Sequence, residues 1–269
     1  MELKVQGQAA YAYTGGKAFA TAYRGDEPVV VFIHGAEQDH SGWTLQSRWF
    51  AYHGYRVLAP DLPGHGRSAG GPLTSIEALA DWIVALLDAA GIARARLVGH
   101  SMGSLIALAA TSRHPARIEQ LALIGSAVPM PVSDVLLGAA QHDEPQAARL
   151  INDWSHSPRG LIGGNTVPGL WLLGMNQQLM ARQKPGVFYA DLNACNQYAP
   201  SPESLRAIAS PVLIVAGSSD RMTPPKAVRQ LAEQLGHVRQ VMLTGAGHAL
   251  MAEQPDAVLD ALRAFILVD

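Results

Sequence analysis

The stretch Gly99-His100-Ser101-Met102-Gly103 decides the fold of this chain, because of the residues on either side of it. Residues 93–98 (ARARLV) are typical of a short strand, and residues 104–110 (SLIALAA) are typical of a buried helix. Between a strand and a helix, Gly-x-Ser-x-Gly forms a tight turn that holds the serine in a strained conformation and exposes its hydroxyl. Ser101 is therefore the candidate nucleophile, and its chemistry requires a base and an acid elsewhere in the chain.

The same pattern occurs a second time, in residues 66–70 (GRSAG), without these flanks. It follows the turn-rich stretch 61–65 (DLPGH) and precedes Gly71-Pro72, which cannot continue a helix. We therefore predict that Ser68 is a loop residue and takes no part in catalysis.

Composition limits the class of protein. The chain has 269 residues, of which 48% are hydrophobic and 16% charged, as expected of a domain with a large core. Its net charge of −2 favours neither nucleic acid nor an anionic membrane as a partner. The chain shows no signal peptide and no apolar stretch as long as a membrane span, so we expect a cytoplasmic protein. Cys195 is the only cysteine, which excludes an intrachain disulfide and a thiolate metal cluster. The oligomeric state is left open.

Short apolar runs alternate with longer segments of helical periodicity. This alternation predicts an α/β fold with a mostly parallel sheet and helices on both faces. Residues 1–25, in which Tyr11, Tyr13, Phe19 and Tyr23 nearly alternate, predict an antiparallel pair of strands at one edge. The expected parallel strands include residues 29–33, 55–59, 97–98, 121–124, 212–216 and 241–243.

Residues 129–210 interrupt this rhythm, because they contain helical segments and no buried strand. We predict a core domain of residues 1–128 and 211–269, with residues 129–210 inserted as a helical cap over the carboxyl ends of the sheet. The cap is rich in large apolar side chains, most of which are expected to hold it together. Four of them are candidates for the substrate pocket: Trp154, Trp171, Met175 and Tyr189.

Two later strands end in residues that could complete the chemistry. Asp220 follows the strand 212–216 and a turn of small residues, and His248 follows the strand 241–243 and a glycine turn. Asp220 could instead cap the helix that begins near residue 224. However, serine, aspartate and histidine form a catalytic triad in many hydrolytic enzymes, and in α/β proteins they follow one another in this order along the chain. We therefore predict that Ser101 is the nucleophile, His248 the base and Asp220 the acid.

The oxyanion formed on attack requires backbone donors. One predicted donor is the N–H of Met102, directly after the nucleophile. The other is the N–H of Ala36, in the loop after the strand 29–33, where Gly35 lets the chain turn. His34 is expected to anchor this loop through hydrogen bonds.

Together these motifs resemble the α/β-hydrolase superfamily over essentially the whole chain. The residues that carry the resemblance are His34-Gly35, the stretches 61–68 and 99–103, Gly217 to Asp220, and Gly247-His248. The resemblance implies an α/β-hydrolase fold and a structural role for the 61–68 loop, but it does not fix the substrate. Related epoxide hydrolases and dehalogenases use an aspartate at the nucleophile position, so Ser101 favours acyl transfer to water.

The chain is therefore predicted to be a carboxylic ester hydrolase for small or medium, largely apolar esters. Carbon–carbon bond hydrolases of vinylogous diketones and lactonases use the same triad and remain alternatives, although the loop 36–43 lacks the Gly/Ser-rich pattern of the former. A ligand-binding protein that has this fold but no enzymatic turnover is a third alternative. In that loop Glu37, Asp39 and His40 are expected to face solvent, with contact to the substrate as the alternative. We expect no metal, nucleotide or other cofactor, since no cluster has metal-ligand spacing and no strand precedes Gly-x-Gly-x-x-Gly.

Overall fold

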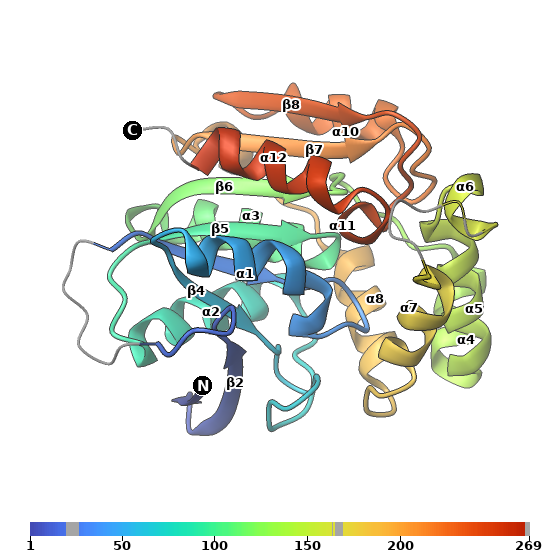
Figure 1. Ribbon diagram of the computed structural model, residues 1–269, viewed down its shortest axis with the longest axis horizontal. Coiled ribbons are helices and arrows are strands. Elements are labelled where there is room, and N and C mark those ends of the chain that lie inside the picture. The colour runs from blue at the N-terminus through green and yellow to red at the C-terminus, as the bar shows by residue number, and fades with distance from the viewer. Residues whose placement is uncertain (20–26, 163, 165–168, 267–269) are drawn as a thin grey trace.

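The computed structural model describes residues 1–19, 27–162, 164 and 169–266. In this part of the chain, eight strands form one sheet in the order β1-β2-β4-β3-β5-β6-β7-β8 (Figure 1). β1 pairs with β2 and β2 with β4 in antiparallel fashion, and the remaining neighbours are parallel. The strands are Glu2–Val5 (β1), Gln8–Tyr13 (β2), Val29–Ile33 (β3), Arg56–Pro60 (β4), Ala95–His100 (β5), Ile118–Ile124 (β6), Val212–Gly217 (β7) and Val238–Leu243 (β8).

This arrangement confirms the predicted mostly parallel sheet and its antiparallel edge. Tyr23, which contributed to the edge prediction, lies outside the described residues. All five side chains of β3 are buried, as expected for a parallel strand with helices on both faces.

Helices occur where the sequence predicts them: after the nucleophile turn (α3), near residue 224 (α10) and within residues 129–210 (α4, α5 and α7 to α9). α6 and α11 have four residues each, and neither they nor α1 were predicted. No helix in the described part of the chain combines the length and hydropathy needed to cross a membrane. The helices are Thr44–Tyr52 (α1), Ile76–Ala89 (α2), Met102–Arg113 (α3), Asp134–His142 (α4), Glu144–Ser155 (α5), Pro158–Leu161 (α6), Leu172–Met180 (α7), Val187–Gln197 (α8), Pro202–Arg206 (α9), Pro225–Ala232 (α10), Leu250–Glu253 (α11) and Pro255–Ile266 (α12), with 3₁₀ turns at His40–Trp43 (η1) and Pro115–Arg117 (η2).

Two apolar clusters cover the two faces of the sheet. On one face Phe50 of α1 and Leu262 of α12 pack with Phe32 of β3, and Figure 1 shows these helices in front of the sheet. On the other face α2, α3 and α10 contribute, with Ile83 and Leu105 among the buried residues. Burial of this kind contributes about 25 cal/mol for each Å² of apolar surface and is the main force that holds the layers together.

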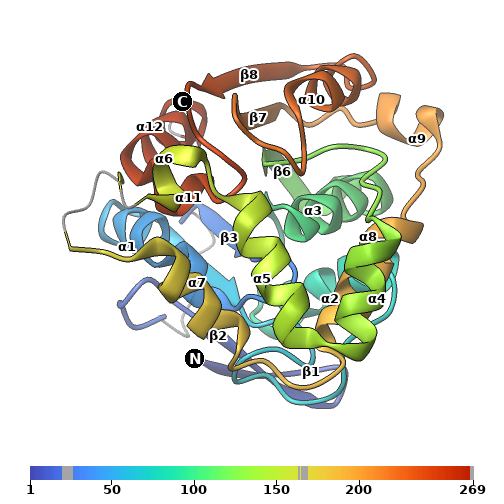
Figure 2. The ribbon, with the colours of Figure 1, turned by 90° about the vertical axis from the view of Figure 1, so that its right-hand side faces the viewer.

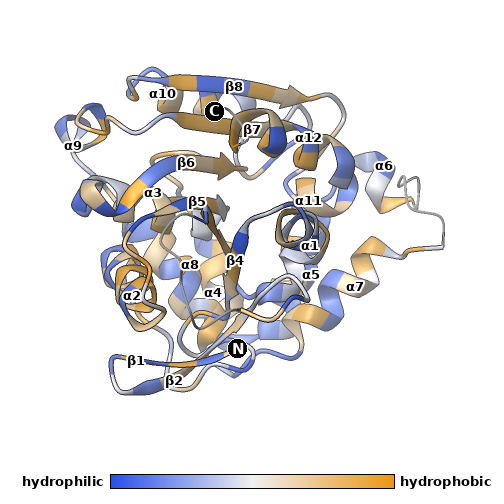
Figure 3. Ribbon diagram, turned by 60° about the vertical axis from the view of Figure 1, so that its left-hand side comes forward, coloured by the Kyte–Doolittle hydropathy of each residue, from blue (hydrophilic) through white to orange (hydrophobic). Residues whose placement is uncertain are grey.

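Helices α4 to α9 all lie between β6 and β7 in the sequence. Figure 3 shows the arrowheads of β6 and β8 pointing toward α6 and α7, and Figure 2 shows α4 to α7 in front of the sheet when it is viewed from that end. α4, α5, α7 and α8 share an apolar cluster that includes Leu136 and Phe188. The second half of α8, with Cys195, instead belongs to the main core beside α2 and α3. The segment is therefore anchored in the core through α8, and its predicted limits as a cap, residues 129–210, stay a prediction.

Candidate active site

Ser101 stands at the turn between β5 and α3 with φ 52° and ψ −119°. This conformation is strained for a residue with a side chain, and such strain is characteristic of functional turns. The turn requires a glycine on each side. A Cβ on Gly99 would collide with the backbone of Gly103, and a Cβ on Gly103 would collide with the carbonyl oxygen of Ile33 at the end of β3.

Asp220 and His248 meet beyond the ends of β7 and β8. His248 Nδ1 lies 2.8 Å from Asp220 Oδ2, and both side chains are buried. The hydroxyl of Thr223 donates to the same oxygen at 2.6 Å, and the backbone N–H groups of Met222 and Thr223 donate to Oδ1 at 2.8 Å. Asp220 thus orders the turn before α10 and also binds the histidine, but it does not cap the helix, whose N-cap Pro224 has no side-chain cap hydrogen bond.

The environment of Asp220 keeps it ionised. Burial by itself would raise the pKa of this carboxyl, but the charge of His248 and the hydrogen bonds from His248 and Thr223 outweigh burial and lower the pKa to about 2. A permanently charged carboxylate on Nδ1 holds the imidazole in one orientation and stabilises its cation.

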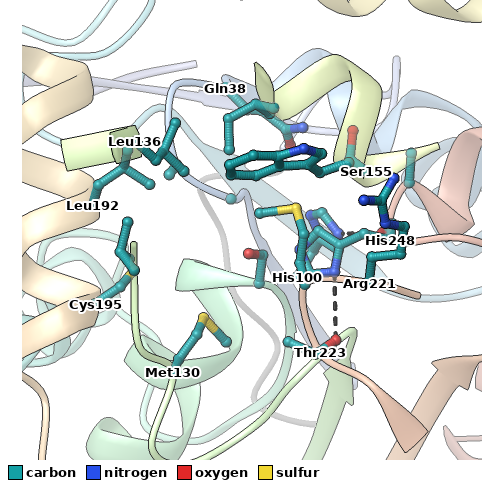
Figure 4. A pocket seen from close by; sticks show the side chains of 18 of the residues that line it. Gln38, His100, Met130, Leu136, Ser155, Leu192, Cys195, Arg221, Thr223 and His248 are labelled. Atoms are coloured by element: carbon teal, nitrogen blue, oxygen red, sulfur yellow. Dashed lines mark hydrogen bonds between the residues drawn. The ribbon is translucent and has the colours of Figure 1, made fainter. Parts of the chain in front are cut away.

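The other imidazole nitrogen of His248, Nε2, is not bound to Asp220. Nε2 is buried and has no hydrogen-bond partner in the part of the chain that the structure describes. His248 and Ser101 line the same cavity of about 290 Å³ (Figure 4). Because Nδ1 is occupied by Asp220, Nε2 is the nitrogen available for proton transfer.

Two neighbours hold His248 in place. His100 Nε2 donates to the carbonyl oxygen of His248 at 2.9 Å, and the two rings lie 4.9 Å apart. The backbone N–H of His248 donates to the carbonyl oxygen of Ser155, at the end of α5, at 2.7 Å. Glu253 accepts from the N–H of Gly247 at 3.1 Å and from that of Ser157 at 3.2 Å. The helical segment after β6 therefore supports the histidine loop directly, which no sequence motif indicated.

The loop after β3 lies against the nucleophile. A Cβ on Gly35 would come within 3.4 Å of the Cβ of Ser101, and Ala36 lines the same cavity. Met102 is the first residue of α3, so its N–H has no acceptor within the helix. His34 accepts from the N–H of Leu62 at 3.1 Å and donates through Nδ1 to the carbonyl oxygen of Gly35 at 2.8 Å, in agreement with its predicted anchoring role.

The polar residues of this loop do not face solvent, contrary to the prediction. Glu37 and Asp39 are only 4% and 6% exposed, and His40 is half-buried against Asp61. The reason is that α8 covers the loop. Asp191 of α8 accepts from the N–H of Glu37 at 2.9 Å.

Asp191 also binds the loop that carries the second serine motif. His65 Nε2 lies 2.8 Å from Asp191 Oδ2. Burial disfavours the charged form of His65, but the charge of Asp191 and this hydrogen bond raise the pKa of the imidazole. Asp191 therefore joins α8, the Gly35–Glu37 loop and the 61–68 loop at one buried point. No motif in the sequence marks this aspartate, because its partners lie more than a hundred residues away.

Glu37 is neutral at neutral pH. Burial first, and then the negative charges of Asp191 and Glu144, raise its pKa from 4.5 to about 9. The folded protein thus holds a proton on Glu37 that the unfolded chain releases above pH 4.5. The contribution of Glu37 to the free energy of unfolding is therefore expected to be greatest below pH 4.5 and to fall as the pH rises toward 9.

Replacing Glu37 by glutamine should remove this pH-dependent loss. Relative to the parent protein, Glu37→Gln is expected to raise Tm more at pH 8 than at pH 5, by about 2–4 °C for each kcal/mol recovered. Calorimetric melting at both pH values measures the difference. Glu233 is exposed at the end of α10, and Glu233→Gln is the matched control. An equal effect of the two variants at both pH values would contradict the assignment.

Of the four cap residues predicted to contact substrate, only Trp154 lines the cavity of Ser101. Trp171 is 68% exposed at the start of α7, and Tyr189 packs in the apolar cluster of α4, α5, α7 and α8. Met175 borders a neighbouring cavity of about 450 Å³ that also contacts His100. Trp171, Met175 and Tyr189 thus do not line the cavity of Ser101, because periodicity shows that a helix has an apolar face but not which neighbour that face meets.

Most of the cavity that contains Ser101 is apolar. Figure 4 shows Leu136, Leu192 and Cys195 on the side opposite His248 and Arg221. Burial and the charge of Asp191 raise the pKa of the Cys195 thiol, so this thiol stays neutral and unreactive. The apolar lining comes from Met130, Leu136, Ile151, Trp154, Phe188 and Leu192.

One group of side chains has the ligand types of a metal site: Asp39, His40 and Asp61, whose ligand atoms lie within 4.8 Å of one another. Asp61 Oδ1 already accepts from the backbone N–H of His40 at 2.8 Å and lies 2.7 Å from its ring nitrogen. Asp39 Oδ1 accepts from the N–H of Ser41 at 2.8 Å. These hydrogen bonds account for the cluster as a support of the loop before α1.

Comparison with known proteins identifies the family. The model of the alpha/beta hydrolase fold family matches residues 28–255. The chain belongs to the α/β-hydrolase family.

The relatives of this hydrolase differ in the bonds and substrates that their names imply. It is 29% identical to pimeloyl-[acyl-carrier protein] methyl ester esterase of Neisseria meningitidis, over 78% of this chain and 82% of the relative. It is also 29% identical to 2-hydroxy-6-oxononadienedioate/2-hydroxy-6-oxononatrienedioate hydrolase of Burkholderia vietnamiensis, over 72% of each chain. The crystal structure of the enol-lactonase from Burkholderia xenovorans covers both chains completely, with a TM-score of 0.84 and 24% identity, and supports the fold. Membership in the family thus supports a hydrolase and leaves its substrate open.

Proposed function

We propose that this hydrolase cleaves carboxylic esters through an acyl-enzyme, with Ser101 as nucleophile, His248 as base and Asp220 as the acid of the triad. One observation carries the proposal. His248 binds a buried, ionised Asp220 through Nδ1, and its Nε2 has no hydrogen-bond partner among the described residues. His248 also lines the same cavity as the strained Ser101.

The reaction proceeds in two halves. Ser101 Oγ attacks the ester carbonyl carbon while its proton moves to His248 Nε2, and the alcohol leaves with that proton. Water then attacks the acyl-enzyme, gives a proton to Nε2, and the carboxylic acid is released as Ser101 recovers its proton. Asp220 holds the ring and stabilises the imidazolium in both halves.

The backbone N–H groups of Met102 and Ala36 are proposed to bind the oxyanion. The position of Met102 at the start of α3 supports its role, since the positive end of the helix dipole favours negative charge there. The role of Ala36 is supported by the anchoring of its loop, because hydrogen bonds fix the residues on either side: Gly35 bonds to His34, and Glu37 bonds to Asp191. A fixed donor costs no reorganisation when the charge develops.

The cavity favours small or medium, largely apolar acyl or alcohol groups. Its volume of about 290 Å³ and its lining of Leu, Ile, Phe, Met and Trp side chains support this substrate class. The proposed chemistry uses only side chains and backbone groups of the chain, and it requires no cofactor.

Turnover of p-nitrophenyl acetate and butyrate tests the proposal. We expect hydrolysis of both, and we expect a phosphonate ester to inactivate the protein by forming a single adduct on Ser101, measured by mass spectrometry of peptides. Turnover that persists after complete labelling would contradict an acyl-enzyme on this serine. A protein that is neither active nor labelled would favour a ligand-binding role.

A panel of substrates separates the ester hydrolase from its two alternatives on the same triad. A lactonase or a carbon–carbon bond hydrolase would turn over lactones or vinylogous diketones with kcat/KM far above that for simple esters, because specificity reflects differential binding of the transition state. We expect the simple esters to have the higher values.

A further inference from the structure

The guanidinium of Arg221 lies at the cavity. Among the described residues that line it, Arg221 is the only lysine, arginine, aspartate or glutamate. Its side chain is exposed, and no hydrogen bond or ion pair of Arg221 is present within the described ranges. Figure 4 shows the guanidinium on the same side of the cavity as His248.

The backbone on both sides of Arg221 is fixed. Asp220 Oδ1 accepts from the N–H groups of Met222 and Thr223 at 2.8 Å, and the N–H of Ser219 donates to the carbonyl oxygen of Ala246 at 2.9 Å. The turn that positions the acid of the triad therefore also positions Arg221. The side chain is held at its base beside the reaction centre, and its five donors are left for a ligand.

We propose that Arg221 binds a carboxylate of the substrate, so that the esters cleaved here carry a negative charge on the part that reaches the rim of the cavity. This inference rests on the proposed function. A planar guanidinium matches the two oxygens of a carboxylate, and one cation balances one negative charge. A phosphate dianion would call for more positive charge than the described lining supplies. The remaining apolar lining would hold the uncharged part of the same substrate.

The experiment compares two esters of similar size, monoethyl glutarate with its free carboxylate and neutral ethyl pentanoate. The parent protein should prefer the carboxylate ester in kcat/KM. In Arg221→Met the ratio of the two kcat/KM values should fall by roughly tenfold or more, because a charge-assisted hydrogen bond is lost for one ester alone. Arg221→Lys should keep part of the preference.

Arg229→Met is the matched control, because Arg229 is an exposed arginine of α10 that does not line the cavity. It should leave the ratio unchanged. A parent ratio at or below one, or an equal loss on both esters in Arg221→Met, would overturn the proposal, since an equal loss indicates a structural role only.

Binding of the same esters to Ser101→Ala, measured by calorimetry, repeats the comparison without turnover. Tighter binding of monoethyl glutarate that depends on Arg221 supports the carboxylate site even if ester cleavage fails. Hydrolysis of p-nitrophenyl butyrate without any Arg221-dependent preference would instead overturn this inference and leave the proposed function standing.

Discussion

Ser101→Ala is expected to lower kcat/KM for p-nitrophenyl butyrate by about 10⁴-fold or more. The hydroxyl of Ser101 is the only group that forms a covalent bond to the substrate in this mechanism. Without it the acyl-enzyme cannot form, and the other catalytic groups have no such intermediate to act on. Initial rates at matched protein concentrations, with active-site titration of the parent protein, measure the loss. Residual activity above about one per cent of the parent value would argue against Ser101 as nucleophile.

Ser68→Ala is the internal control, because Ser68 lies in the second Gly-x-Ser-x-Gly stretch. Its hydroxyl donates to the carbonyl oxygen of Asp61 at 2.6 Å and accepts from the N–H of Tyr11 at 3.0 Å, so it joins a loop to β2. The variant should lose about 1–3 kcal/mol of stability, because buried partners lose a hydrogen bond. It should still form the phosphonate adduct on Ser101. Circular dichroism of both variants separates a catalytic loss from unfolding.

Local sequence was sufficient to predict the positions of Ser101, Asp220 and His248. Each follows a strand, and the carboxyl ends of parallel strands meet at one edge of a sheet. Once the strands are recognised, the topology brings residues 101, 220 and 248 to the same end without knowledge of any contact. The flanks of the serine also separated Ser101 from Ser68, since a proline and glycines follow Ser68 where a helix would have to start.

Contacts between the inserted helices and the loops could not be predicted in this way. Glu37 is buried because Asp191, 154 residues later, accepts a hydrogen bond from its N–H. The position of Trp171 and Met175 outside the Ser101 cavity could not be predicted either, because the orientation of α7 depends on how it packs, and no periodicity encodes that. Arg221 follows directly after the predicted acid, and a charged residue at that point was a signal that could have been used.

Asp220→Asn is expected to lower kcat/KM by about 10⁴-fold through the wrong imidazole tautomer. Oδ1 accepts from two backbone N–H groups, those of Met222 and Thr223, so the amide oxygen of asparagine must occupy that position. The NH₂ group then takes the place of Oδ2 and donates to His248 Nδ1. An imidazole that accepts at Nδ1 carries its proton on Nε2 and cannot take the proton of Ser101.

The tautomer itself can be measured, because nitrogen chemical shifts of His248 distinguish a protonated Nδ1 from a protonated Nε2. We expect the proton on Nδ1 in the parent protein and on Nε2 in Asp220→Asn, with slower labelling of Ser101 by the phosphonate. Asp153→Asn, at an exposed aspartate of α5, controls for the loss of one negative charge and should keep both the tautomer and the rate. An Asp220→Asn protein that retains a tenth of the parent activity, or that keeps the proton on Nδ1, would remove Asp220 from the triad and leave it as the residue that orders the turn before α10.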